Sequence, residues 1–285
     1  MSNALFVKDV LDQIYPTLQP KEKLDEFIYG QILSISGNYA VAASSPSLSF
    51  SDPRTRMAYI YMYVGAHARY LAKILHIASR ELGGVLFNSG NIKVSCLGGG
   101  PGTDALGILK YLRENKKEPI IGNLTCNVFD KEPSWNQNWH QISRLAGAPL
   151  NPFFATVDVS QELTPAIRNE ISDSDLITIS YLISEVEKLN GSGNVSRFFE
   201  ACFDLAKPGA LLVYVDNSGS HTDFFDAIPR SEEWILLSKY DWSHAMPQWG
   251  SDGEDVTPLD GYKKKFFDRS YRIAAKLSFR IFKKT

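Results

Sequence analysis

Apolar residues recur at helical spacing through the first ~90 residues of the chain. This spacing predicts helices over 7–15 and 21–33, and a longer helix over 54–82. Asp52 and Pro53 would start the longer helix, because aspartate is a favoured N-cap and proline suits the first helical position. The chain is therefore expected to open with a helical region.

One face of the long predicted helix carries a stripe of large side chains. The stripe consists of Tyr59, Tyr63, Tyr70, Ile74 and Ile77. A helix with one apolar stripe buries it against another part of the protein. We therefore expect this face to pack on the remainder of the chain.

From Ile92 onward, short apolar runs alternate with helical stretches. The runs predict strands over 92–97, 124–129, 153–157, 175–180 and 210–215. Helices are predicted between them over 103–115, 136–146, 161–171 and 195–205. Such alternation predicts a parallel sheet with helices on both faces.

The end of the chain departs from this alternation. Strands are predicted over 233–240 and 271–282, joined by a long polar loop over 241–260. Without a helix between them, these two strands should be antiparallel. The expected fold is α/β, with a seven-stranded, mostly parallel sheet, an antiparallel C-terminal strand pair and an N-terminal helical cap. The expected division is a cap over 1–89 and a sheet domain over 90–285.

Charge and cysteine content narrow the functional classes. The chain has 30 basic and 32 acidic residues, so its near-zero net charge does not favour a nucleic-acid partner. The 3 cysteines are scattered in apolar segments without metal-ligand spacing, which indicates reduced thiols and a cytoplasmic protein. The apolar runs are shorter than the ~18 residues that span a bilayer, and the N-terminus does not resemble a signal peptide. No membrane association is expected.

Glycines follow the first predicted strand and precede a predicted helix. Gly98, Gly99, Gly100 and Gly102 would let a ligand approach the backbone closely, and the new helix would offer it free N–H groups. The loop fits two cofactor motifs, GxGxG and the dinucleotide pattern that ends at Ala105. An ordinary turn between a strand and a helix is a third interpretation.

Other features of the sheet region, taken together, favour the GxGxG motif. Acidic residues follow the second and third strands, at Asp130 and Asp158. The turn Leu205-Ala206-Lys207-Pro208-Gly209 introduces the fifth strand. From Ile92 to its end the chain therefore resembles the class I S-adenosylmethionine-dependent methyltransferases, whose fold is Rossmann-like.

The resemblance implies a set of cofactor contacts. The four loop glycines would hold S-adenosylmethionine, and Asp130 would accept hydrogen bonds from the ribose hydroxyls. Asp158 would lie near the adenine amino group, although it could instead cap a helix. Trp135 could stack on adenine or belong to the core. The neighbours Lys131 and Val159, with Ser180 at the end of the fourth strand, complete the implied set.

One position departs from the family pattern. Many members have an acidic residue two positions before the first loop glycine, where this chain has Cys96. We hypothesise that Asp104, in the first turn of the next helix, takes over that role. If the pocket is the one usual in the family, Cys96→Asp should bind the cofactor at least as well as the natural chain.

Methyl transfer from a sulfonium is an in-line displacement that requires positioning and water exclusion, and no metal is obligatory. No metal site is predicted, because the 5 histidines lack ligand spacing and Ser180 replaces a carboxylate that a catechol-type metal site needs. No catalytic residue can be assigned, but Tyr181, Glu185 and His244 are candidates near the acceptor. His67 and Arg69 could also reach the site if the N-terminal region covers it.

The acceptor is expected to be a small molecule or a protein side chain rather than RNA, and the oligomeric state is left open. One alternative is an NAD(P)-dependent oxidoreductase that uses the loop up to Ala105 and Asp130. No Tyr-x-x-x-Lys pair follows the fourth strand to support it. A second alternative is a non-catalytic protein that binds S-adenosylmethionine.

Overall fold

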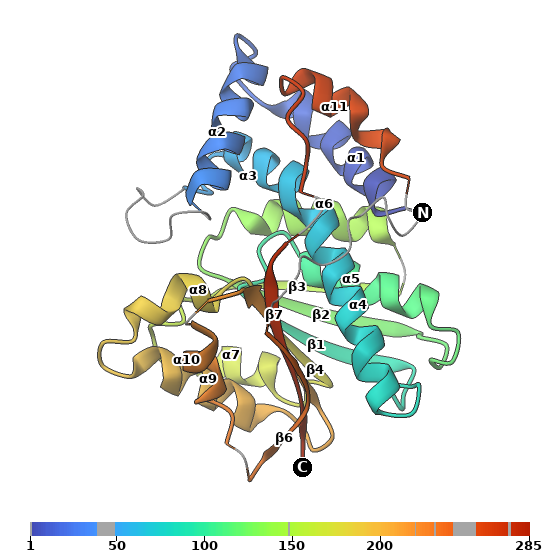
Figure 1. Ribbon diagram of the computed structural model, residues 1–285, viewed down its shortest axis with the longest axis vertical. Helices are drawn as coiled ribbons and strands as arrows, with labels where there is room; N and C mark the ends of the chain where they lie inside the picture. Colours follow the sequence, from blue (N-terminus) through green and yellow to red (C-terminus); the bar gives the residue numbers. More distant parts are fainter. Residues whose placement is uncertain are drawn as a thin grey trace.

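The computed structural model describes residues 2–38, 49–147, 149–219, 221–230, 232–241, 255–272 and 275–285. Seven strands form one sheet in the order β3-β2-β1-β4-β5-β7-β6 (Figure 1). The strands are β1 Asn91–Leu97, β2 Asn123–Asp130, β3 Leu150–Thr156, β4 Leu176–Ser180, β5 Leu211–Asn217, β6 Trp234–Tyr240 and β7 Leu277–Lys284. Strands β1 to β5 are parallel, and β7 runs antiparallel to both β5 and β6. The predicted sheet is confirmed.

Helices form the N-terminal region, as predicted. They are α1 Asn3–Ile14, η1 Tyr15–Thr17, α2 Leu24–Asn38, α3 Pro53–Tyr59 and α4 Gly65–Glu81. Asp52 caps α3 by accepting a hydrogen bond from the Arg54 N–H, and Pro53 is its first residue. The predicted long helix is interrupted by a π-helical segment, Ile60–Val64. Single π-helical turns are frequent near functional sites.

Most of the remaining helices flank the sheet, whereas η5 and α11 lie beside the N-terminal helices (Figure 1). They are α5 Thr103–Glu114, α6 Trp135–Ala146, α7 Pro165–Ile171, α8 Ile183–Val186, η3 Glu187–Leu189, α9 Asn194–Leu205, α10 His221–Asp226, η5 Thr257–Leu259 and α11 Asp260–Lys265. The sequence patterns did not predict α8, α10 or α11. These three helices have six residues or fewer, so they are too short for a helical periodicity to show.

Three predicted boundaries were wrong. The final strand begins at Leu277 rather than at residue 271, because its partner β5 ends at Asn217, opposite Leu277. The preceding chain turns to the N-terminal helices instead, where the Arg272 N–H donates to the Met62 carbonyl. Helix α7 begins at Pro165 rather than at 161 and is capped by Thr164. Strand β3 starts three residues earlier than predicted, at Leu150 rather than 153.

Two apolar clusters cover the two faces of the sheet. One includes Val94, Cys96 and Val213 together with the inner faces of the N-terminal helices and α5. The other includes Ile177 and Tyr214 together with α7 and α9. Alternate strand residues therefore face opposite clusters, as the period of a strand requires. The N-terminal helices share a core with the sheet, and the domain boundary at residue 90 stays a prediction.

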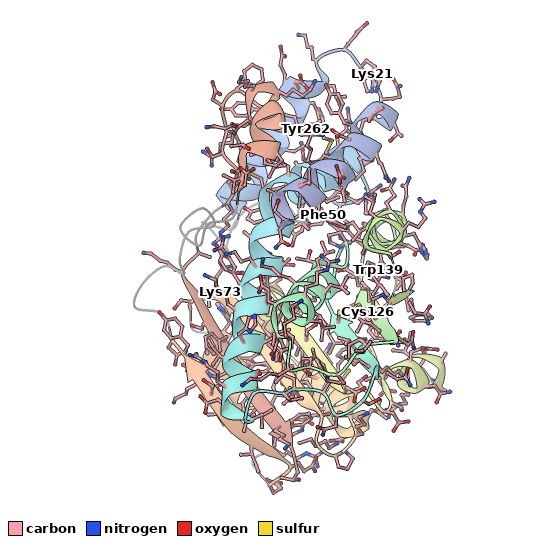
Figure 2. The ribbon with its side chains drawn as sticks, turned by 90° about the vertical axis from the view of Figure 1, so that its right-hand side faces the viewer. Lys21, Phe50, Lys73, Cys126, Trp139 and Tyr262 are labelled. Carbon is pink, nitrogen blue, oxygen red and sulfur yellow. The ribbon has the colours of Figure 1, made fainter. Side chains whose placement is uncertain are left out.

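Figure 2 shows how the N-terminal region reaches the sheet. Phe50, just before α3, lies between the N-terminal helices and the sheet region that contains Trp139 and Cys126. Tyr262 lies among the N-terminal helices, toward the end of the molecule away from the sheet. Tyr262 donates a hydrogen bond to Asp12 of α1 at 2.8 Å, which ties the C-terminal α11 to the start of the chain. Within the ranges given above, no helix combines the length and apolarity that a bilayer crossing requires.

Candidate functional site

A cavity of about 640 Å³ opens where the parallel strands β1, β2, β3 and β4 end. β1 pairs with β2 on one side and with β4 on the other, so the strand order reverses here. Ligands of open α/β sheets bind outside the carboxyl ends of the strands at such a reversal. Chain segments from the glycine loop, the β2–α6 and β3–α7 loops, α3 and α8 form its wall.

The glycine loop adopts a conformation that other residues rarely tolerate. Gly98, Gly100 and Gly102 have φ angles of 69°, 51° and 86°. A Cβ at Gly102 would lie 2.0 Å from the Trp139 ring, so the loop is fitted closely against α6. A Cβ at Gly100 would instead meet nothing closer than 3.9 Å. That open side faces the cavity, which Gly98 and Gly100 line.

Asp130 joins the glycine loop to the end of β2. Its carboxylate accepts hydrogen bonds from the backbone N–H groups of Gly100 and Glu132, both at 2.9 Å. A carboxylate has about four acceptor positions, so Asp130 retains acceptor capacity beyond these two hydrogen bonds. Burial raises the pKa of Asp130 to about 6, although backbone N–H donors, those of Glu132 and Gly100 foremost, oppose the shift. Asp130 is therefore a pre-positioned acceptor at the cavity wall.

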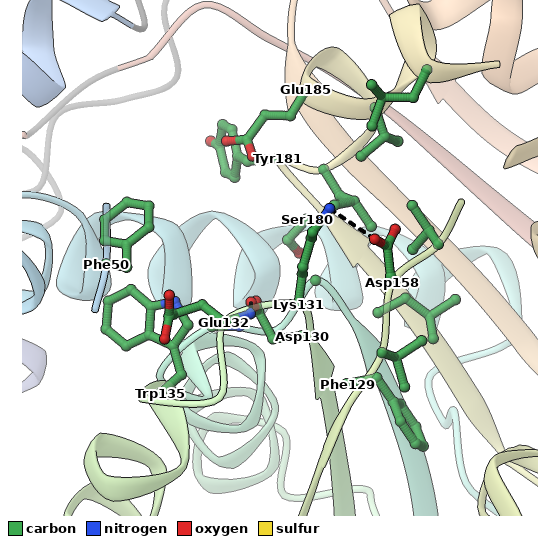
Figure 3. Close-up of a pocket in the computed structure, with 18 of the residues that line it drawn as sticks. Phe50, Phe129, Asp130, Lys131, Glu132, Trp135, Asp158, Ser180, Tyr181 and Glu185 are labelled. Atoms are coloured by element: carbon green, nitrogen blue, oxygen red, sulfur yellow. Dashed lines mark hydrogen bonds and ion pairs between the residues drawn. The ribbon is translucent and has the colours of Figure 1, made fainter. Parts of the chain in front are cut away.

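Asp158 is engaged with protein groups on the cavity rim. Its carboxylate pairs with the Lys131 ammonium at 2.7 Å (Figure 3). It also accepts hydrogen bonds from the N–H and the hydroxyl of Ser160. Burial by itself would raise the pKa of Asp158, but these partners outweigh it and lower the pKa. Asp158 does not cap the next helix, because Thr164 does so. The ion pair bridges the loops that follow β2 and β3.

Trp135 and Asp158 lie on opposite sides of the cavity, with Asp130 and Lys131 between them (Figure 3). Trp135 packs against Phe50 and Tyr59, with ring centroids 5.1 and 5.4 Å apart. The two adenine contacts that the resemblance implied therefore lie on different sides of the cavity, and both stay predictions.

Three predicted cofactor residues do not line the cavity. Gly99 packs under the loop against Cys96 and Val128, and Gly102 packs against Trp139. The buried Asp104 carboxylate accepts from the Thr178 hydroxyl of β4 at 2.5 Å, and burial raises its pKa. Gly98, Gly100, Asp130, Lys131, Trp135, Asp158, Val159 and Ser180 do line it.

The chain after β4 brings two predicted catalytic candidates to the cavity, Tyr181 and Glu185. Tyr181 has a φ of 57°, which is strained for a tyrosine. Its ring stacks on His67 of α4, with centroids 3.8 Å apart and an interplanar angle of 13°. The buried Asp216 carboxylate accepts from both the N–H and the hydroxyl of Ser184, which fixes the start of α8 beside Glu185.

Other candidates lie elsewhere. His244 and the surrounding aromatic segment 242–249 lie outside the described residues. His67 and Arg69 are buried and do not line the cavity. In the described parts of the chain, no three His, Cys, Asp or Glu side chains gather as a metal site would require.

Sequence reasoning missed Phe50 and Glu132, and it placed Tyr59 only on a packing stripe; all three line the cavity. Phe50 is held there by the buried Arg56. The Arg56 guanidinium donates to the carbonyls of Phe50 and Ser51 at 2.7 and 2.8 Å, and to Asn138 of α6 at 2.7 Å. Glu132 could have been found from its place two residues after Asp130, whereas no local pattern marks Phe50.

No protein-family model and no curated protein matches the chain. Among solved structures it is similar to the N-methyltransferase NodS from Bradyrhizobium japonicum WM9 in complex with S-adenosyl-L-homocysteine, with 12% identity and a TM-score of 0.43 over 78% of this chain and 88% of that chain. A putative methyltransferase from Thermoplasma acidophilum has 9% identity and a TM-score of 0.44 over 68% of this chain and 69% of that chain. The [4+2]-cyclase SpnF has 12% identity and a TM-score of 0.43 over 75% of this chain and 81% of that chain.

Likenesses this distant do not assign a reaction. The strand order of the sheet, by contrast, identifies the fold. Its antiparallel β7 lies between β5 and β6, so the fold is the Rossmann-like fold of class I S-adenosylmethionine-dependent methyltransferases.

Proposed function

We propose that the protein is a methyltransferase that uses S-adenosylmethionine and needs no metal ion. The observation that carries the proposal is Asp130, which lines the cavity and whose carboxylate is held in place by the backbone N–H groups of Gly100 and Glu132. A ribose offers two neighbouring hydroxyl donors, and one carboxylate can accept both in charge-assisted bonds. The structure thus supplies the acceptor that a nucleoside cofactor requires.

The rest of the cavity fits the other parts of this cofactor. Apolar lining suits a purine ring: Val157 and Val159 flank Asp158 in the sequence, and with Leu182, Val186 and Phe198 they belong to one apolar cluster that reaches the cavity. Gly100 leaves room for the ligand to approach the loop backbone. The methionyl part would then lie over the glycine loop, with its sulfur toward Tyr181 and Glu185.

When bound, the cofactor supplies an electrophilic methyl group on a positively charged sulfur. The protein has to hold an acceptor in line with that methyl group and exclude water. The aromatic side chains Phe50, Tyr59, Trp135 and Tyr181 form that part of the wall. A small molecule or a protein side chain is favoured as the acceptor, because one end of a cavity of about 640 Å³ admits a single side chain or a compound of that size.

An NAD(P)-dependent oxidoreductase would use the same loop and the same aspartate. The dinucleotide-binding sheet has a parallel strand order of 3-2-1-4-5-6. Here an antiparallel strand lies between β5 and β6. This difference favours the methyltransferase.

Calorimetric titration with S-adenosylmethionine, S-adenosylhomocysteine, NAD and NADP tests the proposal. We expect one saturable site for the two adenosyl amino acids, lost in Asp130→Ala, and no saturable site for the nicotinamide cofactors. Tighter binding of NAD or NADP would overturn the proposal, as would adenosyl binding that Asp130→Ala leaves unchanged. Asp175→Ala is the control, since Asp175 immediately precedes β4, pairs with Lys207 and does not line the cavity.

A further inference from the structure

Both apolar clusters of the molecule reach the cavity, and they meet it with different side chains. The cluster that includes α7 and α9 supplies the apolar lining that we propose for the adenine. The cluster of the N-terminal helices supplies three aromatic rings, Phe50, Tyr59 and Trp135, which we call the aromatic corner. Figure 3 shows Phe50 and Trp135 on the side of the cavity away from Asp158. The aromatic corner therefore lies in the part of the cavity that the proposed cofactor pose leaves free.

The three rings of the aromatic corner contact one another at defined angles. Trp135 is 3% exposed and packs against both Phe50 and Tyr59. The Phe50 and Tyr59 side chains keep part of their surface open. Their ring centroids are 5.5 Å apart, and the two ring planes are nearly perpendicular, at 82°. Trp135 thus backs the corner, and Phe50 and Tyr59 form its surface.

Contacts within the protein hold the aromatic corner in place. The buried Arg56 guanidinium donates to the Phe50 carbonyl and to the Asn138 side chain, both at 2.7 Å, and so fixes Phe50 relative to α6. The Tyr59 ring packs on Tyr63 as well, with centroids 5.3 Å apart. Because a charged group is costly to bury, the buried Arg56 indicates that the position of Phe50 is specified. A wall that is ordered before binding loses little conformational entropy when a ligand arrives.

A perpendicular pair of rings favours a third flat ring. Aromatic rings attract one another most in offset-stacked and in edge-to-face arrangements. Because the Phe50 and Tyr59 planes are nearly perpendicular, a ligand ring that stacks on one of them stands edge-to-face to the other. A saturated ring fills the same volume without gaining these contacts. The aromatic corner therefore distinguishes a flat ring from a saturated ring of the same size.

We propose that the methyl acceptor is a small aromatic compound whose ring binds in the aromatic corner. This inference rests on the proposed methyltransferase function and its cofactor pose, and it adds the substrate class. Tyr181, toward which the sulfur is proposed to point, lies on the same side of the cavity as Phe50 (Figure 3). A ring in the corner would hold one of its substituents beside the methyl group. Such positioning is what an in-line displacement requires of the protein.

Matched probes that differ only in the saturation of the ring test this assignment. One pair is 2-naphthol and decahydro-2-naphthol, and the other is benzyl alcohol and cyclohexylmethanol. All four probes are uncharged, and the two members of a pair carry the same hydroxyl group. Each is titrated by calorimetry into the full chain saturated with S-adenosylhomocysteine. We expect each aromatic probe to bind about tenfold tighter than its saturated match, as two ring–ring contacts predict.

Variants of the aromatic corner separate ring recognition from a structural role. Phe50→Leu and Tyr59→Leu should each reduce the preference for the aromatic probe to about threefold, because one ring–ring contact is lost. Tyr59→Phe should keep the full preference, since it keeps the ring. Phe198→Leu is the matched control, because Phe198 also lines the cavity but belongs to the other apolar cluster. A purely structural role would weaken both probes of a pair equally and leave the preference unchanged.

The inference is overturned if a saturated probe binds as tightly as its aromatic match. It is also overturned if Phe50→Leu and Tyr59→Leu both leave the preference unchanged, or if no probe binds the chain saturated with S-adenosylhomocysteine. Aromatic probes that bind only the free chain would show that the adenine itself occupies the aromatic corner. A chain that does not bind S-adenosylhomocysteine at all would instead refute the proposed function, and that result precedes the probe titrations.

Discussion

The two ends of the cavity are built in different ways. The end around Asp130 consists of backbone and short side chains from consecutive loops, held by hydrogen bonds from Gly100 and Glu132. The end around Tyr181 consists of large side chains from α3, α4 and α8, held by ring packing. The first arrangement suits one fixed ligand, whereas the second can change its specificity through single side chains. This difference supports our proposal that the first end holds the cofactor and the second the acceptor.

The largest expected effect concerns the backbone at the cofactor end. Gly102→Ala should lower the free energy of unfolding by about 3 kcal/mol or more, because its Cβ would overlap Trp139 and its φ of 86° disfavours any side chain. Gly261→Ala is the control, since nothing lies within 4 Å of its Cβ position. Urea unfolding of both variants measures the difference. Equal stabilities would show that the loop is not closely fitted to α6.

Next in size is the contrast between the two aspartates. Asp130→Ala should weaken S-adenosylhomocysteine binding about a hundredfold, because two hydrogen bonds to a charged group are lost. Asp158→Ala should weaken it about fivefold at most, since that carboxylate already has Lys131 and Ser160 as partners. Calorimetric titration gives both values. The reverse order would place the ribose on the Asp158 side.

A smaller effect is expected where the N-terminal region meets the cavity. Arg56→Lys should weaken S-adenosylhomocysteine binding about fivefold, because an ammonium cannot make the three directed bonds that hold Phe50 against Trp135. Arg54→Lys is the matched control on the same helix, where the arginine pairs with Asp52 near the surface. If both variants bind S-adenosylhomocysteine equally well, Phe50 does not contribute to the binding site.

The pH dependence separates Asp130 from the acceptor end. The pKa of Asp130 in the free protein is raised to about 6, and the ribose hydroxyls need its ionised form as acceptor. Affinity for S-adenosylhomocysteine should therefore fall about tenfold per pH unit below pH 6. Asp130→Asn should bind weakly and without this dependence, and titrations between pH 5 and pH 8 measure both.

The same shift affects folding in the opposite direction. Because the folded protein binds the proton of Asp130 more readily than the unfolded chain does, the contribution of Asp130 to stability increases as pH falls from about 6 toward its unfolded pKa near 4. Replacement by asparagine should remove this part of the dependence. A stability curve identical in both proteins would show that burial does not shift the Asp130 pKa.

The sequence allowed the sheet and several residues that line the cavity around Asp130 to be predicted, because both depend on local patterns. The glycines, the aspartate after β2 and the apolar strand runs are each readable within a few residues. Asp104 shows the limit of such patterns, since its partner Thr178 is 74 residues away and draws it beneath the site. Trp135 shows a similar limit, because its ring packs against Phe50 and Tyr59, which lie far from it in the sequence.

The acceptor end was less predictable for the same reason. Phe50, Tyr59 and Tyr181 meet only after the N-terminal helices have packed over the sheet, and no spacing in the sequence encodes that meeting. The predicted start of the final strand was wrong because pairing with β5, rather than the apolar residues of the segment itself, decides where β7 starts. Contacts between distant segments therefore determine both features, and the sequence pattern could not predict them.

The central claim is that one cavity holds the cofactor on Asp130 and the acceptor at Tyr181 and Glu185. A crystal structure of the protein with S-adenosylhomocysteine bound tests it most directly. We predict both ribose hydroxyls within hydrogen-bond distance of the Asp130 carboxylate, the adenine against the apolar side near Asp158, and the sulfur facing Tyr181 and Glu185. An adenine held between Phe50 and Trp135, with the sulfur pointing away from Tyr181, would contradict it.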